Sequence, residues 1–137
     1  QASEPEWTYR GERVPFAANT PTVADLRAGV DVSGGSIPIE RSRAAVFLDS
    51  GGADTISRPG ASTLMGDLLL ERLRRSKHPY PYVHLSYPDA GHTFGMMYLP
   101  GPIAASGGGT EEANVKAGAD STPRLFAFLE RNPEREA

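Results

Sequence analysis

The chain has 137 residues, of which 39% are hydrophobic and 23% charged, a composition typical of one globular domain rather than of a disordered segment. A net charge of -3 argues against a nucleic-acid binder, because a surface that follows phosphates normally carries an excess of lysine and arginine. The absence of cysteine excludes disulfides and thiolate chemistry within the chain, and no apolar run approaches the ~18 residues that a membrane span needs. The start at Gln1, without a methionine or a signal-like segment, suggests a piece of a longer protein, for which we expect a cytoplasmic location.

Residues 1–43 are predicted to form a loop-rich lead-in that belongs to the same domain as the rest. They hold few periodic segments and many breakers, among them Pro5, Pro15 and Gly34-Gly35. A short helix over residues 24–28 is the exception. From residue 44 the pattern changes, and residues 44–137 are predicted to form a βαβα unit.

The first predicted strand is the continuously apolar run at residues 44–48, which is typical of a parallel strand buried on both faces. We expect Asp49 to end this strand and a loop to follow. Apolar residues then recur at spacings of three and four over residues 62–77, which predicts an amphipathic helix. A second, weaker strand is predicted over residues 80–87.

A last helix is predicted to begin after Thr110, which can cap it, with Glu111 and Glu112 in the first turn, where the helix dipole favours carboxylates. Pro123 should kink or restart this helix, because proline lacks the amide hydrogen. We interpret the one basic cluster of the chain as a solvated end of the preceding helix: Arg72, Arg74, Arg75 and Lys77.

Two polar residues follow the two predicted strands. Asp54 comes after the first strand and a pair of glycines, and His92 comes after the second strand and a turn. A strand, helix, strand unit is parallel and right-handed, so both residues should leave the same carboxyl edge of the sheet, where α/β active sites are built. A histidine there can act as a base that a carboxylate orients. Asp54 could equally cap the helix that follows, and Asp49 and Asp89 are competing acids.

No nucleophile accompanies this pair in the sequence. The Gly-x-Ser-x-Gly elbow of serine hydrolases with this architecture is missing, and there is no cysteine to replace it. His78 and His84 are predicted to be structural, and the spacing of the histidines argues against a metal site. The glycines at 107–109 could bind a phosphate, although a turn followed by a helix cap is the better interpretation.

The predicted unit is incomplete as a sheet. Two parallel strands with helices on one side leave the other face and both edges uncovered. The unit therefore looks like the carboxyl-terminal part of a larger α/β sheet. An upstream segment or a second chain must supply the remainder.

Several motifs together carry a resemblance to a known family. They are Ile37-Pro38-Ile39-Glu40, Ser50-Gly51-Gly52-Ala53-Asp54, the run from Lys77 to His92, Tyr98-Leu99-Pro100 and Gly108-Gly109-Thr110. On these motifs residues 37–131 resemble the carboxyl-terminal region of the acyl-CoA thioesterase and bile-acid-CoA:amino-acid N-acyltransferase family, which has the α/β-hydrolase fold. The resemblance implies that Asp54 is the triad acid and His92 the triad base. It also implies hydrolysis of an acyl thioester or ester, or acyl transfer, without a metal or cofactor, by a nucleophile and oxyanion hole that lie upstream of this chain.

Two other interpretations remain open. One is a dienelactone-hydrolase-like esterase with the same acid and base, and the other is a truncated, non-catalytic module that packs against a partner. The triad interpretation predicts that a carboxylate oxygen of Asp54 lies within ~2.6–3.2 Å of His92 Nδ1. It also predicts that none of Ser50, Ser57 and Ser86 serves His92 as the nucleophile.

Overall fold

The computed structural model describes residues 8–14, 24, 28, 38–57, 59–94 and 107–132. The chain divides into two compact units, Gln1–Ile39 and Glu40–Ala137. In the first unit, strands β1 (Thr8–Tyr9) and β2 (Glu12–Arg13) form an antiparallel hairpin. The helix predicted over residues 24–28 falls mostly outside the described residues. The assignment of residues 1–43 to the same domain as the rest stays a prediction.

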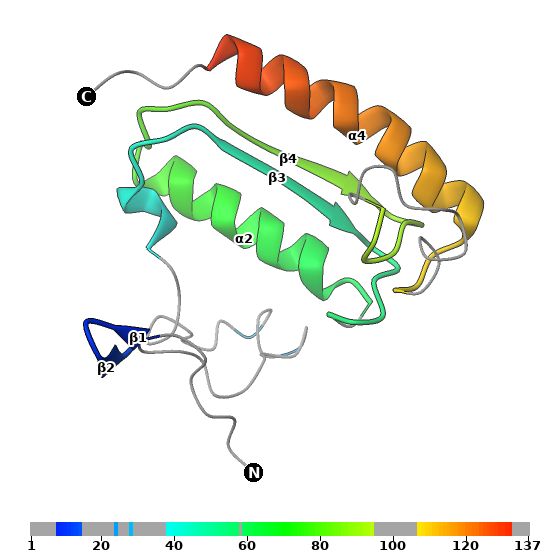
Figure 1. Cartoon of the computed structure of the whole chain (residues 1–137), viewed down its shortest axis with the longest axis horizontal. Helices are drawn as coiled ribbons and strands as arrows, with labels where there is room; N and C mark the ends of the chain where they lie inside the picture. Colours follow the sequence, from blue (N-terminus) through cyan, green and yellow to red (C-terminus); the bar gives the residue numbers. More distant parts are fainter. Residues whose placement is uncertain are drawn as a thin grey trace. The chain divides into compact units, whose positions relative to one another are not determined.

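The second unit has the predicted βαβα order. After a short 3-10 turn, η2 (Ile39–Arg41), it consists of β3 (Val46–Gly51), α2 (Ala61–Arg75), β4 (Tyr82–Tyr87) and α4 (Glu111–Arg131). Strands β3 and β4 are parallel, with Val46 opposite Tyr82 and Gly51 opposite Tyr87. Because the two strands end at the same level, the loops that follow them leave the sheet side by side (Figure 1).

Strand β3 continues beyond the predicted boundary. The expectation that Asp49 ends the strand was wrong, since Asp49 pairs with Leu85 and the ladder runs on through Ser50 and Gly51. The backbone bonding even extends past the strand, where the Gly52 N–H donates to the Tyr87 carbonyl at 2.8 Å. The ladder pairs the backbone N–H and C=O groups here whatever the polarity of the side chains. The apolar run therefore predicted a strand that ends too early.

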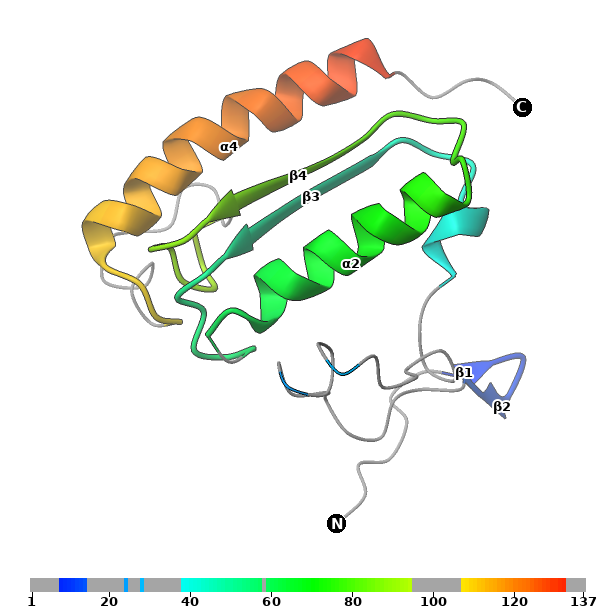
Figure 2. The same ribbon diagram turned by 180° about the vertical axis from the view of Figure 1, so that it is seen from behind.

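The two helices lie on opposite sides of the strand pair, as Figures 1 and 2 both show. Alternate residues of β3 point to opposite faces, so Phe47 packs edge-on against Phe128 of α4 at 5.5 Å, whereas the Ser50 hydroxyl reaches Thr63 of α2. The prediction that the helices cover one side was therefore wrong. Within the described segments, β3 and β4 pair only with each other, so both sheet edges lack a partner strand.

The basic cluster at the end of α2 is exposed at Arg74 and Arg75, as predicted, and its three arginines are also paired with acidic side chains. Arg74 and Arg75 contact Glu71 at 2.8 and 2.7 Å, and Arg72 contacts Glu40 at 2.7 Å. The last of these pairs ties the end of α2 to η2.

Helix α4 begins as predicted, because the Thr110 hydroxyl accepts the Ala113 N–H at 3.1 Å. It does not restart at Pro123, which lies inside the continuous helix. Pro123 and Ala119 are both exposed, so water can reach the Ala119 carbonyl that lost its helical donor. Among the described residues, no helix is long and apolar enough to cross a membrane.

Candidate active site

The two residues predicted as acid and base are in contact. Asp54 Oδ2 and His92 Nδ1 lie 3.0 Å apart, within the range expected for an oriented histidine. Asp54 follows β3 and His92 follows β4, so the common edge of the parallel strands brings them together. The predicted pairing is confirmed as geometry.

Asp54 is held as a buried carboxylate. Its side chain is 4% exposed, and its second oxygen accepts the backbone N–H groups of Ile56 at 2.8 Å and Ser57 at 3.0 Å. Burial alone would raise the pKa of Asp54, but the hydrogen bond from His92 and those from Ser57 and Ile56 outweigh it and hold the pKa below its usual value. These turn bonds replace the alternative role as a helix cap, since the N-cap of α2 is Gly60.

His92 is more exposed than its partner. Its side chain is 39% exposed, whereas that of its partner is almost fully buried. With Nδ1 donating to the carboxylate, Nε2 carries the lone pair and can accept a proton. None of the hydroxyl groups in the described parts of the chain bonds to Nε2, in agreement with the expectation that Ser50, Ser57 and Ser86 do not serve it.

A third backbone segment joins the loops that carry this pair. The Gly107 carbonyl accepts both the Thr55 N–H and the His92 N–H, each at 3.0 Å. The next two residues extend the contact, with Gly108 bridging Asp54 and Gly109 bridging Ala90. The loops approach so closely that a Cβ on Gly91 would collide with the Gly108 carbonyl, which explains the glycine that precedes the histidine. Sequence reasoning found the turn and cap in this segment, and missed its contact with both loops.

Asn114 of α4 makes hydrogen bonds to the same region, and its role was not predicted from the sequence. It is 1% exposed, its Oδ1 accepts the Gly91 N–H at 2.6 Å, and its Nδ2 donates to the Gly108 carbonyl at 3.1 Å. The available signal was its spacing to Ala117 and Ser121, the other buried residues of α4, which marks a polar side chain on the inner face of the helix.

A second serine, histidine and aspartate set lies under α2. Ser50 Oγ is 2.7 Å from His84 Nε2, and His84 Nδ1 is 3.0 Å from Asp67 Oδ1. The His84 side chain is 3% exposed and its ring lies against Gly66 of the helix, which leaves no space for a substrate. His84 therefore connects β4 to α2, in keeping with its predicted structural role.

His78 also has a structural environment. It is 7% exposed, its Nε2 bonds to the Ala44 carbonyl at 3.0 Å, and its ring contacts Tyr80 and Tyr82. Within the described ranges, no group of three or more histidine or acidic side chains could hold a metal ion.

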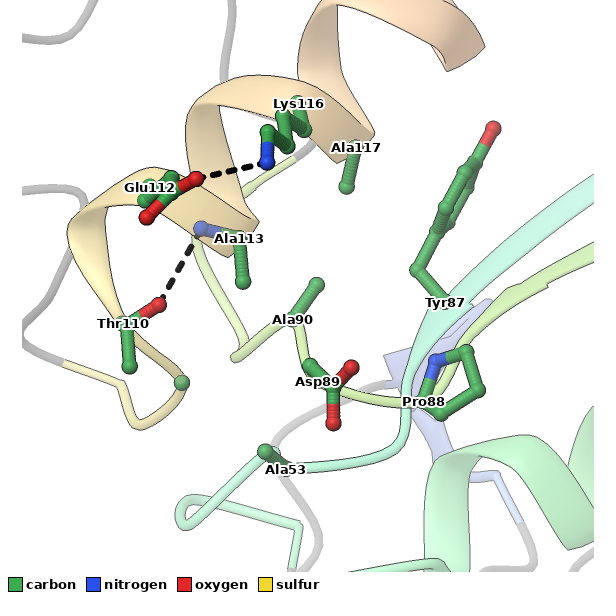
Figure 3. Close-up of a pocket in the computed structure, with 11 residues that line it drawn as sticks. Ala53, Tyr87, Pro88, Asp89, Ala90, Thr110, Glu112, Ala113, Lys116 and Ala117 are labelled. Carbon is green, nitrogen blue, oxygen red and sulfur yellow. Dashed lines mark hydrogen bonds and ion pairs between the residues drawn. The ribbon is translucent and has the colours of Figure 1, made fainter.

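A groove lies beside the pair, between the end of β4 and the first turns of α4 (Figure 3). Its volume is about 630 Å³, and Ala53 and Ala90, from the two loops that carry the acid and the base, contribute to its lining. Glu112 and Lys116 of α4 form an ion pair along its wall. Neither Asp54 nor His92 lines it, so the groove neighbours the pair without containing it.

A buried carboxylate that contacts Nδ1 of a partly exposed histidine, at the carboxyl edge of a parallel sheet, is similar in geometry to the acid and base arrangement of α/β hydrolases. The family model described as BAAT / Acyl-CoA thioester hydrolase C terminal matches residues 16–132. The chain belongs to this family, which confirms the resemblance seen in the sequence. The small parallel sheet and its two helices are consistent with an α/β-hydrolase-like fold. No match was found among curated proteins or among solved structures.

Proposed function

We propose that this chain is the carboxyl-terminal part of an enzyme that hydrolyses acyl thioesters or transfers their acyl group, and that it supplies the acid and base of a nucleophile, histidine and aspartate triad. His92 is the base and Asp54 the acid. The observation that carries the proposal is the 3.0 Å contact between Asp54 Oδ2 and His92 Nδ1, made by a buried carboxylate to a partly exposed ring. The family match supports the thioester as the substrate class.

The proposed chemistry follows from this contact. Asp54 fixes the tautomer in which Nε2 can take the proton of a nucleophile, and it stabilises the imidazolium that forms during the attack on the thioester carbonyl. His92 then returns the proton to the leaving group. Neither residue has a role in binding the oxyanion in this proposal, so a second set of groups must provide its donors.

The nucleophile and oxyanion hole come, we propose, from an upstream segment or a second chain that continues the sheet at β3. The Val46 and Gly52 N–H groups point to β4, so by the alternation of a parallel ladder the backbone groups of Phe47 and Asp49 point to the other edge. Both helices also expose apolar side chains: Met65 and Leu68 on α2, and Val115, Phe126 and Leu129 on α4. A larger sheet flanked by helices would cover both features. We also propose a cytoplasmic location, which rests on the sequence alone.

The test is turnover of an acyl-CoA thioester and of a simple ester by the chain joined to its upstream segment. We expect the joined enzyme to be active and the isolated chain to be inactive. Asp54→Asn should lower kcat by about 10⁴-fold through loss of the correct histidine tautomer, and His92→Ala by about 10⁶-fold.

Asp49→Asn and Asp89→Asn are the matched controls, because both are exposed aspartates in the same part of the sheet and neither contacts a histidine in the described structure. Both should retain full turnover. Ester turnover without thioester turnover would favour the dienelactone-hydrolase-like alternative. Unchanged rates in both the Asp54 and the His92 variants would contradict the proposal and favour the non-catalytic module.

A further inference from the structure

We propose that Asn114 is a positioning residue for the acid and base, and that it acts through the backbone of residues 107–109. This segment bonds to both the Asp54 loop and the His92 loop and fixes their positions relative to each other. The consequence for turnover rests on the proposed function, whereas the positioning itself does not.

The Gly107 carbonyl is shared by the two loops. Thr55 follows the acid directly, and its N–H and the N–H of His92 both donate to Gly107 at 3.0 Å. Apart from this carbonyl, the backbone of the two loops is joined by the Ala53 N–H bond to the Ala90 carbonyl, at 2.9 Å. A displacement of Gly107 therefore changes the position of the base backbone and of the acid loop together.

Residues 107–109 depend on a side chain of α4 for their position. Their conformation is unusual, with φ of 91° at Gly108 and 70° at Gly109, so the backbone there has little intrinsic preference for this path. The Asn114 amide group bridges it to the histidine loop, with Nδ2 donating to the Gly108 carbonyl and Oδ1 accepting the Gly91 N–H. One side chain thus holds the segment and the residue before the base.

Asn114 is itself held in place by the helix that carries it. It lies in the first turns of α4, its own N–H donates to the Thr110 carbonyl at 2.9 Å, and it is 1% exposed. Truncation removes the side-chain partner of the buried Gly91 N–H and of the partly buried Gly108 carbonyl, and water cannot easily take its place. Such losses are large enough to loosen a loop locally.

The test is amide hydrogen exchange of the whole chain, followed residue by residue by NMR. In Asn114→Ala we expect exchange at Thr55, Gly91 and His92 to become about 10-fold faster or more, because each lost bond is worth about a factor of ten in local opening. Exchange in the β3 and β4 ladder should stay unchanged. The Nδ1 proton of His92, bonded to Asp54, should broaden or disappear from the spectrum.

Two further variants keep the test decisive. Ser121→Ala is the matched control, since Ser121 is 3% exposed on the same helix and contacts neither loop in the described structure, and it should leave all of these signals unchanged. Asn114→Asp keeps the acceptor for Gly91 and removes the donor to Gly108. It should protect the Gly91 amide while Thr55 and His92 still exchange faster, even if the alanine variant fails to fold.

The proposal is overturned if Asn114→Ala accelerates exchange equally across β3, β4 and the loops, because Asn114 would then contribute to global stability alone. Unchanged exchange at all three loop amides overturns it as well. In the joined enzyme, Asn114→Ala should lower kcat by about 10-fold or more and leave KM nearly unchanged, because the pair acts in the transition state. Loss of the proposed function would appear separately, as turnover that survives His92→Ala.

Discussion

Replacing Gly66 with alanine should destabilise this protein, although the same change stabilises most helix interiors. Alanine gains about 1 kcal/mol over glycine inside a helix. At this position, however, the added Cβ would collide with Cε1 and Nε2 of the His84 ring. The ring cannot move aside freely, because Ser50 holds Nε2 at 2.7 Å and Asp67 holds Nδ1 at 3.0 Å.

The magnitude follows from what the collision breaks. Overpacking of a filled interior costs about 1–3 kcal/mol, and each of the two hydrogen bonds contributes about 1 kcal/mol. Set against the helix gain of about 1 kcal/mol, the net loss in free energy of unfolding is about 2–4 kcal/mol. The sign of the effect therefore depends on the His84 contact.

Urea denaturation followed by far-UV circular dichroism measures this loss. The matched control is the same change in a His84→Ala background, where the space beside residue 66 is free and the alanine should be neutral or stabilise by up to about 1 kcal/mol. If Gly66→Ala alone stabilises the protein by about 1 kcal/mol, the described packing of His84 against α2 is wrong.

Three further predictions concern single contacts. Thr110→Ala should cost about 1 kcal/mol in urea denaturation, because it removes the side-chain acceptor for the Ala113 N–H at the start of α4. Burial, together with the hydrogen bond to Asp120, raises the pKa of Tyr87. The contribution of the Tyr87 hydroxyl to stability is therefore present below the unfolded-state pKa of about 10 and is lost as pH rises through the folded-state value. Tyr87→Phe should lower the free energy of unfolding by about 1 kcal/mol at neutral pH and should flatten the loss of stability at alkaline pH. The pKa of Asp54 is lowered, so the contribution of its carboxylate to stability is present above about pH 4 and is lost as pH falls through the folded-state value. When the free energy of unfolding is measured at decreasing pH, Asp54→Asn should therefore lose less stability than the unchanged protein.

The order of elements and the Asp54 and His92 contact could be predicted from the sequence, because both depend on rules that the side-chain pattern exposes. An apolar run, a helical period and a second strand define a parallel unit, and a parallel unit places both loops at one edge. The position of α4 could not be predicted in this way. Its apolar period shows that one face is buried, and does not show which face of the sheet receives it.

The contacts that fix the pair were less visible for a different reason. The Gly107 carbonyl that joins the two loops is a backbone group, which every residue type possesses, so no sequence pattern marks it. The bond between Ser50 and His84 joins residues that are distant in the chain, and only the register of β3 and β4 with α2 brings them together. The spacing of Asn114 in the sequence indicated that it faces inward. The groups that it bonds to could not be predicted, because they depend on where α4 lies.

The outer edge of β3 has a consequence for handling the protein. Within the part of the chain that the structure describes, no strand pairs with the Phe47 and Asp49 backbone groups on this edge, and a strand from another copy could occupy them as readily as the natural neighbour. Asp49 places an exposed charge in the middle of that edge, which disfavours stacking of identical strands by like-charge repulsion. Removing this charge, as in Asp49→Asn, would remove the repulsion, so self-association of the isolated chain should increase in that variant.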